Sequence, residues 1–367
     1  MAILQIIRIF AIVTVLLLPA VTYAAPNTVQ PPVFVTPEQI ATLRANPERF
    51  VALKNHCDID LVHAPAPIAD FTPPGRYVDD KGEAKYTGPL AHDGETAYRE
   101  ALCFRVTDNL RYAKKAEAIL DAWVTTVRTL PLQGPGASDF NFFFYPYTIA
   151  ADLLRADPAW DSTHFNQFLR MRVLPASEIN SKAKNNIGNW AVLQWATAGA
   201  YLNDEALIKR AQARWEELLN SEVVADGSLP FEMCRTNTSH WCDGPDKGIN
   251  GMHYTHWTLY PSVIAAEVFR NRGIDIYSTS AGKELNKAYI QTAAWTLHPS
   301  TFPYYMSNKG QLMGVRNAAY FAILQKRMPN ADGAAVLKQD GIKMNVLELL
   351  LLYNDTQENP VLLHHRD

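Results

Sequence analysis

The chain contains 367 residues, 48% of them hydrophobic and 19% charged, which is enough apolar material for a large buried core. Its 34 Lys and Arg residues against 37 Asp and Glu residues give a net charge of -3. This balance excludes a generic nucleic-acid-binding protein with a broad basic face. An acidic polymer is still compatible with it, provided that positive charge is concentrated in a cleft.

Residues 1–24 have the pattern of a secretory signal peptide. Arg8 supplies a positive charge, residues 9–18 form an apolar run, and Thr22-Tyr23-Ala24 offers a small-residue cleavage site. The run is too short for a bilayer span, which takes about 20 residues. We therefore predict cleavage near Ala24, no membrane attachment of the mature chain, and a periplasmic or secreted location. An uncleaved anchor is the alternative.

Helical signals dominate the rest of the chain. The first helix is marked by Thr36-Pro37-Glu38-Gln39, which combines an N-cap, a proline at the first helical position and a capping-box glutamine. A polar segment with Pro and Gly, from about residue 63 to 94, is predicted to cross the surface as a loop. Apolar residues then recur at helical spacing in segments 95–106, 112–127, 147–154, 163–173, 190–202, 205–219, 258–272, 282–296 and 318–327.

The predicted fold class is all-α, because alternating strand patterns are nearly absent. Helical hairpins repeated within one domain favour a toroid or barrel of helices, whose loops at one end build a concave site. A solenoid is the alternative, although no strict sequence period is present. No Gly/Ser linker or charge block divides residues 25–367, so we predict a single domain.

The four cysteines are expected to form disulfides, because an exported chain folds in an oxidising compartment. Cys234 and Cys242 are close enough to close one loop, and Cys57 and Cys103 would then pair by elimination. Metal binding is the weaker alternative, since no cysteine pair has the close spacing of a zinc knuckle.

Four short motifs occur between residues 97 and 277. They are the hairpin pattern Ala-Leu-Cys-Phe-Arg-Val-Thr-Asp to Ile-Leu-Asp-Ala-Trp ending at Trp123, Asn185-Asn186 ahead of Trp190, Asp226-Gly227-Ser228-Leu229-Pro230 with Glu232, and Tyr254 ahead of Leu259. Each is weakly specific alone. Together and in this order, they resemble the alginate lyase superfamily.

This resemblance implies an incomplete (α/α) toroid that cleaves uronic-acid polymers by β-elimination without a required metal or other cofactor. Asn186 matches the amide that neutralises the substrate carboxylate, and Tyr254 matches the tyrosine that acts as base and acid. Arg235 resembles an assisting arginine, although an insertion at 236–252 interrupts the alignment. The chain departs from the family at Ile187, where well-known alginate lyases have histidine. The candidate replacements are His240, His253 and His256.

Further side chains are candidates for substrate binding. Glu232 is expected to orient Arg235 or another donor, because a carboxylate would repel an anionic substrate. Trp241 is expected to present a large ring from the loop closed by Cys234 and Cys242. The predicted substrate contacts are Asn185, Trp190, His240, Trp241, His253, His256, Tyr304, Tyr305 and Arg316.

Structural interpretations compete with these roles. Asn185 and Asn186 could simply cap a helix. Tyr254 could belong to a core aromatic cluster with its neighbours. Arg235 could be an ordinary surface cation.

The chemistry follows from these residue types alone. Elimination removes the weakly acidic C5 proton of a uronate, and amide and guanidinium donors at its carboxylate would stabilise the developing charge as an oxyanion hole does. A tyrosine near cations can have a lowered pKa, take that proton and protonate the leaving O4. One tyrosine serves both steps where H5 and O4 lie on the same side of the ring, as in mannuronate and glucuronate but not guluronate. The choice between those two sugars stays open.

Two other functions also stay open. A glycoside hydrolase would need two separated carboxylates, for which Asp139, Asp226, Glu232 and Asp243 are available. A noncatalytic polyuronate-binding protein is favoured by the loss of histidine at Ile187. In each case we expect a monomer with an acidic polysaccharide partner, no nucleic-acid partner and no metal.

Overall fold

The structure is a computed structural model that describes residues 30–342. The predicted signal peptide, residues 1–24, lies outside the described residues. From Pro31 onward the described chain belongs to one compact unit. None of the described helices combines the length and apolar character that a membrane span requires.

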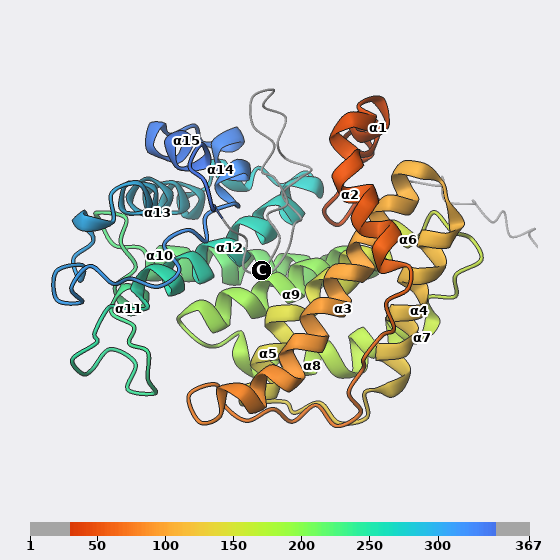
Figure 1. The fold of residues 1–367 in the computed structure, drawn as a ribbon, viewed down its shortest axis with the longest axis horizontal. Coiled ribbons are helices and arrows are strands. Elements are labelled where there is room, and N and C mark those ends of the chain that lie inside the picture. The colour runs from red at the N-terminus through yellow and green to blue at the C-terminus, as the bar shows by residue number, and fades with distance from the viewer. Residues whose placement is uncertain (1–29, 343–367) are drawn as a thin grey trace, which may run out of the picture. The chain divides into compact units, whose positions relative to one another are not determined.

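The described residues form helices and loops without a β-strand, apart from one isolated bridge between Asp70 and Thr129. The fold is therefore all-α, as predicted (Figure 1). The helices are α1 (Pro37–Ala45), α2 (Pro47–Asp60), α3 (Asp80–Thr107), α4 (Leu110–Thr126), α5 (Pro135–Phe143), α6 (Tyr145–Leu154), α7 (Thr163–Phe168), the π-helical η1 (Leu169–Val173), α8 (Leu174–Asn180), α9 (Asn186–Leu202), α10 (Glu205–Glu222), α11 (Pro230–Met233), α12 (Gly251–Asn271), the short 3₁₀ turns η2 (Ile276–Ser278) and η3 (Pro299–Thr301), α13 (Ser280–Leu297), α14 (Phe321–Arg327) and α15 (Ala331–Leu337).

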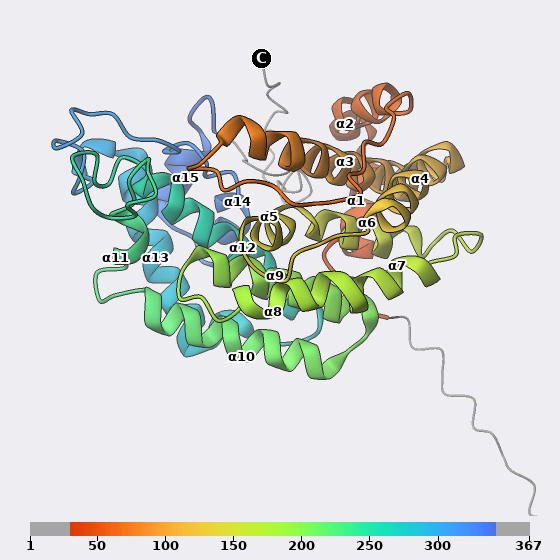
Figure 2. The same cartoon turned by 90° about the horizontal axis from the view of Figure 1, so that it is seen from below.

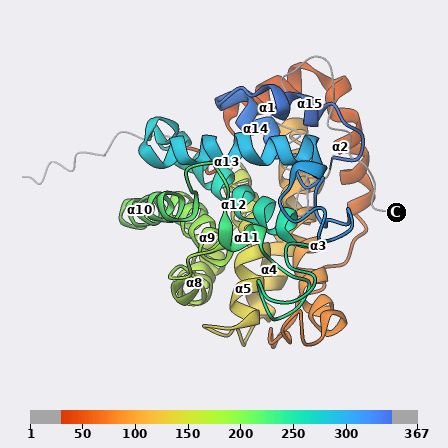
Figure 3. The same cartoon turned by 90° about the vertical axis from the view of Figure 1, so that its left-hand side faces the viewer.

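The helices are arranged in an inner and an outer layer. Helices α3, α6, α9 and α12 pack side by side as the inner layer, and α4, α8, α10 and α13 pack against its outer side. Figures 2 and 3 both show α10 lying outside α9. This is an incomplete (α/α) toroid.

Burial explains which helix occupies which layer. All ten residues of α6 and nearly every residue of α9 are buried, so these helices have no face for solvent. Helix α4 buries a single stripe that includes Ile119, Leu120 and Trp123 and exposes the rest. The sequence therefore assigns the layer of each helix through the width of its apolar face.

Local signals fix several helix ends, including the predicted start of α1. Thr36 and Gln39 form the complete capping box of α1, with each side chain accepting the other's backbone N–H. Between α3 and α4, Asp108 adopts a left-handed conformation at φ 57°, and the Asn109 side chain caps α4 by accepting from the Arg111 amide.

The predicted loop at 63–94 is wrong in its second half. Helix α3 begins at Asp80 and includes Pro89 in its interior. Proline removes one helical hydrogen bond and usually ends a helix. Here Leu90, Asp93 and Gly94 are buried against neighbouring helices, and this packing outweighs the local penalty.

Both predicted disulfides are confirmed. Cys57–Cys103 joins α2 to α3 inside the hydrophobic core, while Cys234–Cys242 closes a short loop directly after α11. The described residues hold no cluster of His, Cys, Asp or Glu suited to a metal ion.

Candidate active site

A groove of about 1120 Å³ lies where the inner helices begin. It is lined by the first turns of α3, α9 and α12, by α5, and by the loop 312–317. The N-termini of helices carry unsatisfied N–H groups and partial positive charge. The groove is thus suited to an anionic ligand although the chain as a whole is weakly acidic.

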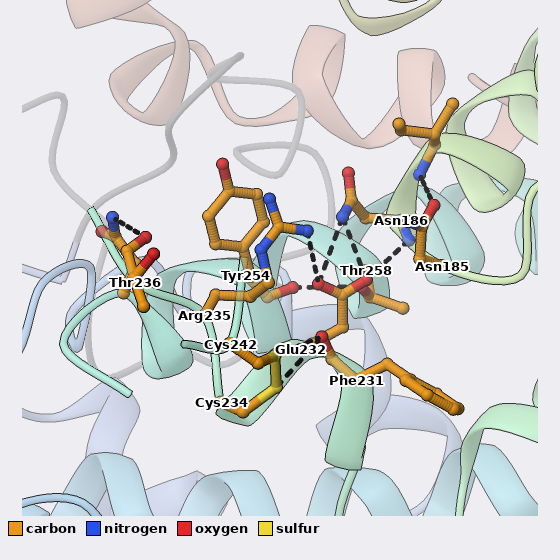
Figure 4. A network of polar contacts seen from close by, with 12 residues as sticks. Asn185, Asn186, Phe231, Glu232, Cys234, Arg235, Thr236, Cys242, Tyr254 and Thr258 are labelled. Atoms are coloured by element: carbon orange, nitrogen blue, oxygen red, sulfur yellow. Dashed lines mark hydrogen bonds and ion pairs between the residues drawn. A yellow bond between two sulfur atoms is a disulfide. The ribbon is translucent and has the colours of Figure 1, made fainter. Parts of the chain in front are cut away.

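Asn186, Arg235 and Tyr254 line the groove and, together with the buried Glu232 that contacts Asn186 and Arg235, form what we call the amide wall. Glu232 is fully buried and accepts from the Asn186 backbone N at 2.7 Å and from Asn186 Nδ2 at 2.9 Å (Figure 4). Its other oxygen lies 3.9 Å from Arg235 Nη1. Glu232 therefore holds Asn186 by hydrogen bonds and lies within ion-pair distance of Arg235.

Burial and the neighbouring donors have opposite effects on the pKa of Glu232. Burial raises the pKa of Glu232 above its ordinary value, although the hydrogen bonds from Asn186, the charge of Arg235 and the Thr258 hydroxyl oppose this shift. The donors around Glu232 thus offset part of the cost of burying its charge. Asn186 Nδ2 donates to both oxygens of Glu232, at 2.9 Å and 3.2 Å, so Glu232 fixes the Asn186 amide beside the groove.

Arg235 lies between two aromatic rings. Its guanidinium carbon is 4.0 Å from the centre of the Tyr254 ring and 4.2 Å from that of Trp241. The residue is 5% exposed, so it is not an ordinary surface cation. Burial of the charge is offset by Glu232 and by the two ring faces.

The Tyr254 hydroxyl faces the groove and shares a 2.5 Å hydrogen bond with the Tyr77 hydroxyl. The expectation of a lowered pKa is wrong for this state. Burial and the neighbouring Tyr77 raise the pKa of Tyr254, and together they outweigh Arg235, which lowers it. The resting form of Tyr254 is therefore the neutral phenol.

The three candidate histidines lie in different surroundings. His253 lines the groove, where burial and then the charges of Arg76 and Arg235 lower its pKa to about 4. Its Nδ1 faces the Asn317 amide nitrogen at 3.3 Å, which places the ring proton on Nε2. His253 is therefore a neutral imidazole at the groove.

The prediction that His256 and His240 contact the substrate is wrong, because neither lines the groove. His256 is buried in the core, where its ring contacts the Tyr320 hydroxyl at 3.0 Å and the Thr296 hydroxyl at 3.2 Å. Its position on α12 lies off the helix face that carries the groove-lining residues His253, Tyr254 and Trp257, so its side chain enters the core. His240 is exposed on the loop after Cys234 and does not line the groove.

Among the other predicted contacts, Trp241 and Arg316 line the groove. Trp190 is wrong as a contact, because it is fully buried beneath the groove-lining Trp257, with their ring centres 4.6 Å apart. Asn185 caps α9 through the Ile187 amide and does not line the groove. Tyr304 and Tyr305 pack on a separate small cluster around Trp295 and Phe302.

A second set of groove-lining residues, which we call the acid wall, consists of Glu83 on α3 and Asp139 on α5. Asp139 is 4% exposed, and its Oδ2 has no hydrogen-bond partner among the described residues. Burial, with the nearby Glu83, raises the pKa of Asp139 to about 8. A carboxyl that finds no partner is therefore neutral at neutral pH.

Sequence reasoning missed Tyr77, Arg76 and Glu83 because they fall in the segment that was predicted to be a surface loop. Gly75-Arg76-Tyr77 carries no local signal that distinguishes it from an exposed turn. The helical spacing of Glu83, Thr87 and Ala91, all on one face of α3, was the available clue.

Comparison with known proteins adds the following. A family model described as alginate lyase matches residues 63–302. A polysaccharide lyase from Stenotrophomonas maltophilia is 31% identical over 98 residues, which are 27% of this chain and 26% of that protein. The match thus spans about a quarter of the relative's length.

Two solved structures are similar in fold. An alginate lyase from Bacteroides ovatus has a TM-score of 0.68 at 15% identity, covering 89% of this chain and 99% of that chain. Alginate lyase A1-III from Sphingomonas species A1 has a TM-score of 0.62 at 16% identity, covering 81% and 88%. At these identities the likeness establishes the toroid fold only.

Proposed function

Because the chain belongs to the alginate lyase family, we propose that it is a polysaccharide lyase that cleaves a β-1,4-linked polyuronate, polymannuronate or glucuronan, by β-elimination. The product would carry an unsaturated uronate at the new non-reducing end. The single observation that carries this proposal is the amide wall, which sets an amide donor and a guanidinium beside one groove-facing phenol.

The first task of such a site is to stabilise the uronate carboxylate as C5 loses its proton. The Asn186 amide, held by Glu232, and the Arg235 guanidinium, in contact with the Tyr254 ring, would be in place before substrate arrives. Donors that need no reorganisation act most strongly where charge develops in the transition state. The helix N-termini around the groove add to this field.

The second task is proton transfer at Tyr254. The neutral resting phenol would first lose its proton to solvent. As phenolate it would then take H5, the C5–H electron pair would form the C4=C5 bond, and the C4–O4 bond would break. The phenol formed in this way would return the proton to O4, which regenerates the phenolate for the next turnover. Arg235 over the ring and a hydrogen bond donated by Tyr77 would stabilise the phenolate.

This economy requires H5 and O4 on the same side of the sugar ring. We therefore propose a preference for mannuronate or glucuronate over guluronate. C2, the only centre at which those two sugars differ, is remote from both reacting atoms, so the amide wall would accept either.

The test incubates the protein with polymannuronate, glucuronan, polyguluronate and hyaluronan while following the ultraviolet absorbance of the conjugated unsaturated uronate. A rise with polymannuronate or glucuronan supports the proposal. Equal cleavage of polyguluronate would contradict the stereochemical part.

A hydrolase is the second candidate because Asp139 is a protonated carboxyl at the groove, as a general acid must be. Glu232 is occupied by Asn186 and is a poor second carboxylate. Reducing ends that form without ultraviolet absorbance would favour hydrolysis. Binding without either product would favour the noncatalytic alternative.

We also propose that the protein acts in the periplasm or outside the cell. The two disulfides support an oxidising compartment, and the N-terminal sequence pattern agrees with export.

A further inference from the structure

The loop closed by the Cys234–Cys242 disulfide fixes the backbone of Trp241. Trp241 has a left-handed backbone at φ 60°, which is unusual for a bulky residue and persists only where the surroundings enforce it. Its carbonyl accepts from the Thr236 amide at 2.6 Å, and the disulfide fixes the next residue. Asn250, at the start of α12, donates to the Thr236 carbonyl at 3.0 Å and so anchors the loop.

The Trp241 ring covers Arg235. The indole is 49% exposed while the arginine is 5% exposed, so the ring separates the guanidinium from solvent. Arg235 Nε is buried and has no hydrogen-bond partner among the described residues, and the contact with Glu232 is long at 3.9 Å. Hydrogen bonds alone therefore do not fix the plane of this guanidinium; the faces of Trp241 and Tyr254 do.

We propose that Trp241 is a positioning residue that holds Arg235 against Tyr254, and that the Cys234–Cys242 disulfide is needed to keep it there. The proposal rests on the proposed function, in which Arg235 acts on the uronate carboxylate. Loss of the ring would let the long Arg235 side chain sample other rotamers and take up water. A displacement of about 1 Å in such a group can cost roughly 100-fold in rate.

The first experiment compares Trp241→Ala with Trp241→Phe on the best polyuronate substrate. We expect Ala to lower kcat about 10- to 100-fold with little change in KM, and Phe to retain most of the rate, since it keeps a flat ring over the cation. In an Arg235→Ala background, Trp241→Ala should cost nothing further, because the partner is already absent. A rise in KM at constant kcat, or an equal additional loss without Arg235, would show that Trp241 binds substrate directly and would overturn the proposal.

The two disulfides provide a matched control. Replacing Cys234 and Cys242 together with Ser should lower kcat as Trp241→Ala does. Replacing Cys57 and Cys103 together with Ser should instead lower Tm more and leave kcat unchanged, because that bond closes a 46-residue separation in the core against 8 residues at the site. Equal kcat in the two double variants contradicts the proposal.

A readout without substrate keeps this test separate from the proposed function. The readout is the nuclear magnetic resonance signal of the Arg235 Nε–H group in protein labelled with ¹⁵N at arginine. The signal is assigned by its loss in Arg235→Lys, and in the wild type it should show that this group is ordered. Trp241→Ala and the Cys234/Cys242 double variant should disorder it, and the Cys57/Cys103 double variant should not. If no polymer yields an unsaturated product, the proposed function fails while this signal still decides the positioning role; a signal unaffected by Trp241→Ala overturns that role.

Discussion

The two walls of the groove bury carboxyl groups by opposite means. On the amide wall, Glu232 is surrounded by donors from Asn186 and by Arg235. On the acid wall, Asp139 is equally deep, has an unpartnered oxygen, and has its pKa raised to about 8. Burial alone therefore does not decide charge in this groove; the donors around each carboxyl do. The amide wall presents donors to an anionic ligand. On the acid wall, the Asp139 carboxyl is neutral and therefore does not repel such a ligand.

The largest expected effect comes from removing the proton carrier of the amide wall. Tyr254→Phe keeps the ring that packs on Arg235 but removes the hydroxyl. General acid–base groups contribute about 10²- to 10⁴-fold, so turnover should fall by at least that range while circular dichroism stays unchanged. A fully active variant would transfer the role to His253, the neutral imidazole at the groove.

The next effect tests the donor that Glu232 orients. Asn186→Ala removes the amide and should lower kcat by about 10²- to 10³-fold, as loss of an oxyanion-hole donor does, with a smaller change in KM. Steady-state kinetics on the preferred polymer measure both. A change confined to KM would mean that Asn186 binds ground state and transition state equally.

A third prediction concerns the acid wall and stability. Between about pH 4 and pH 8 the folded protein keeps the Asp139 proton that the unfolded chain has lost, so stability falls as pH rises through this window. Asp139→Asn should make Tm less dependent on pH and raise it most near pH 8. Glu100→Gln is the matched control, because Glu100 on α3 is also buried with a pKa raised to about 8 but lies outside the groove. Glu100→Gln should also make Tm less dependent on pH, but it should leave the pH profile of kcat/KM unchanged. A wild-type Tm that does not change between about pH 4 and pH 8 would refute the raised pKa of Asp139.

The smallest effect separates two adjacent amides. Asn185 caps α9, so Asn185→Ala should cost about 1 kcal/mol of stability, seen as a modest fall in Tm. Its kcat should equal that of the wild type, in contrast to Asn186→Ala. A large loss of kcat here would restore Asn185 to the site.

The difference between these neighbours shows where sequence patterns stop. The pair Asn185-Asn186 predicted a cap or a catalytic amide, and the structure contains both, one at each position. Likewise, the sequence does not distinguish His253 from His256. In the structure, His253 lines the groove, whereas His256, three residues later on α12, is buried in the core. Trp190 was predicted in the groove and instead supports Trp257 from below.

The sequence by itself determined what short-range physics controls: the capping box of α1, the apolar faces that sort helices into layers, the cysteine pairs and the motifs of the family. Only the tertiary structure decided the groove, because its contacts join Asn186 to Glu232 across 46 residues and Tyr77 to Tyr254 across 177. It also continued α3 through Pro89 and set the pKa of Tyr254 above its ordinary value. Burial and through-space charge depend on neighbours that the order of residues does not reveal.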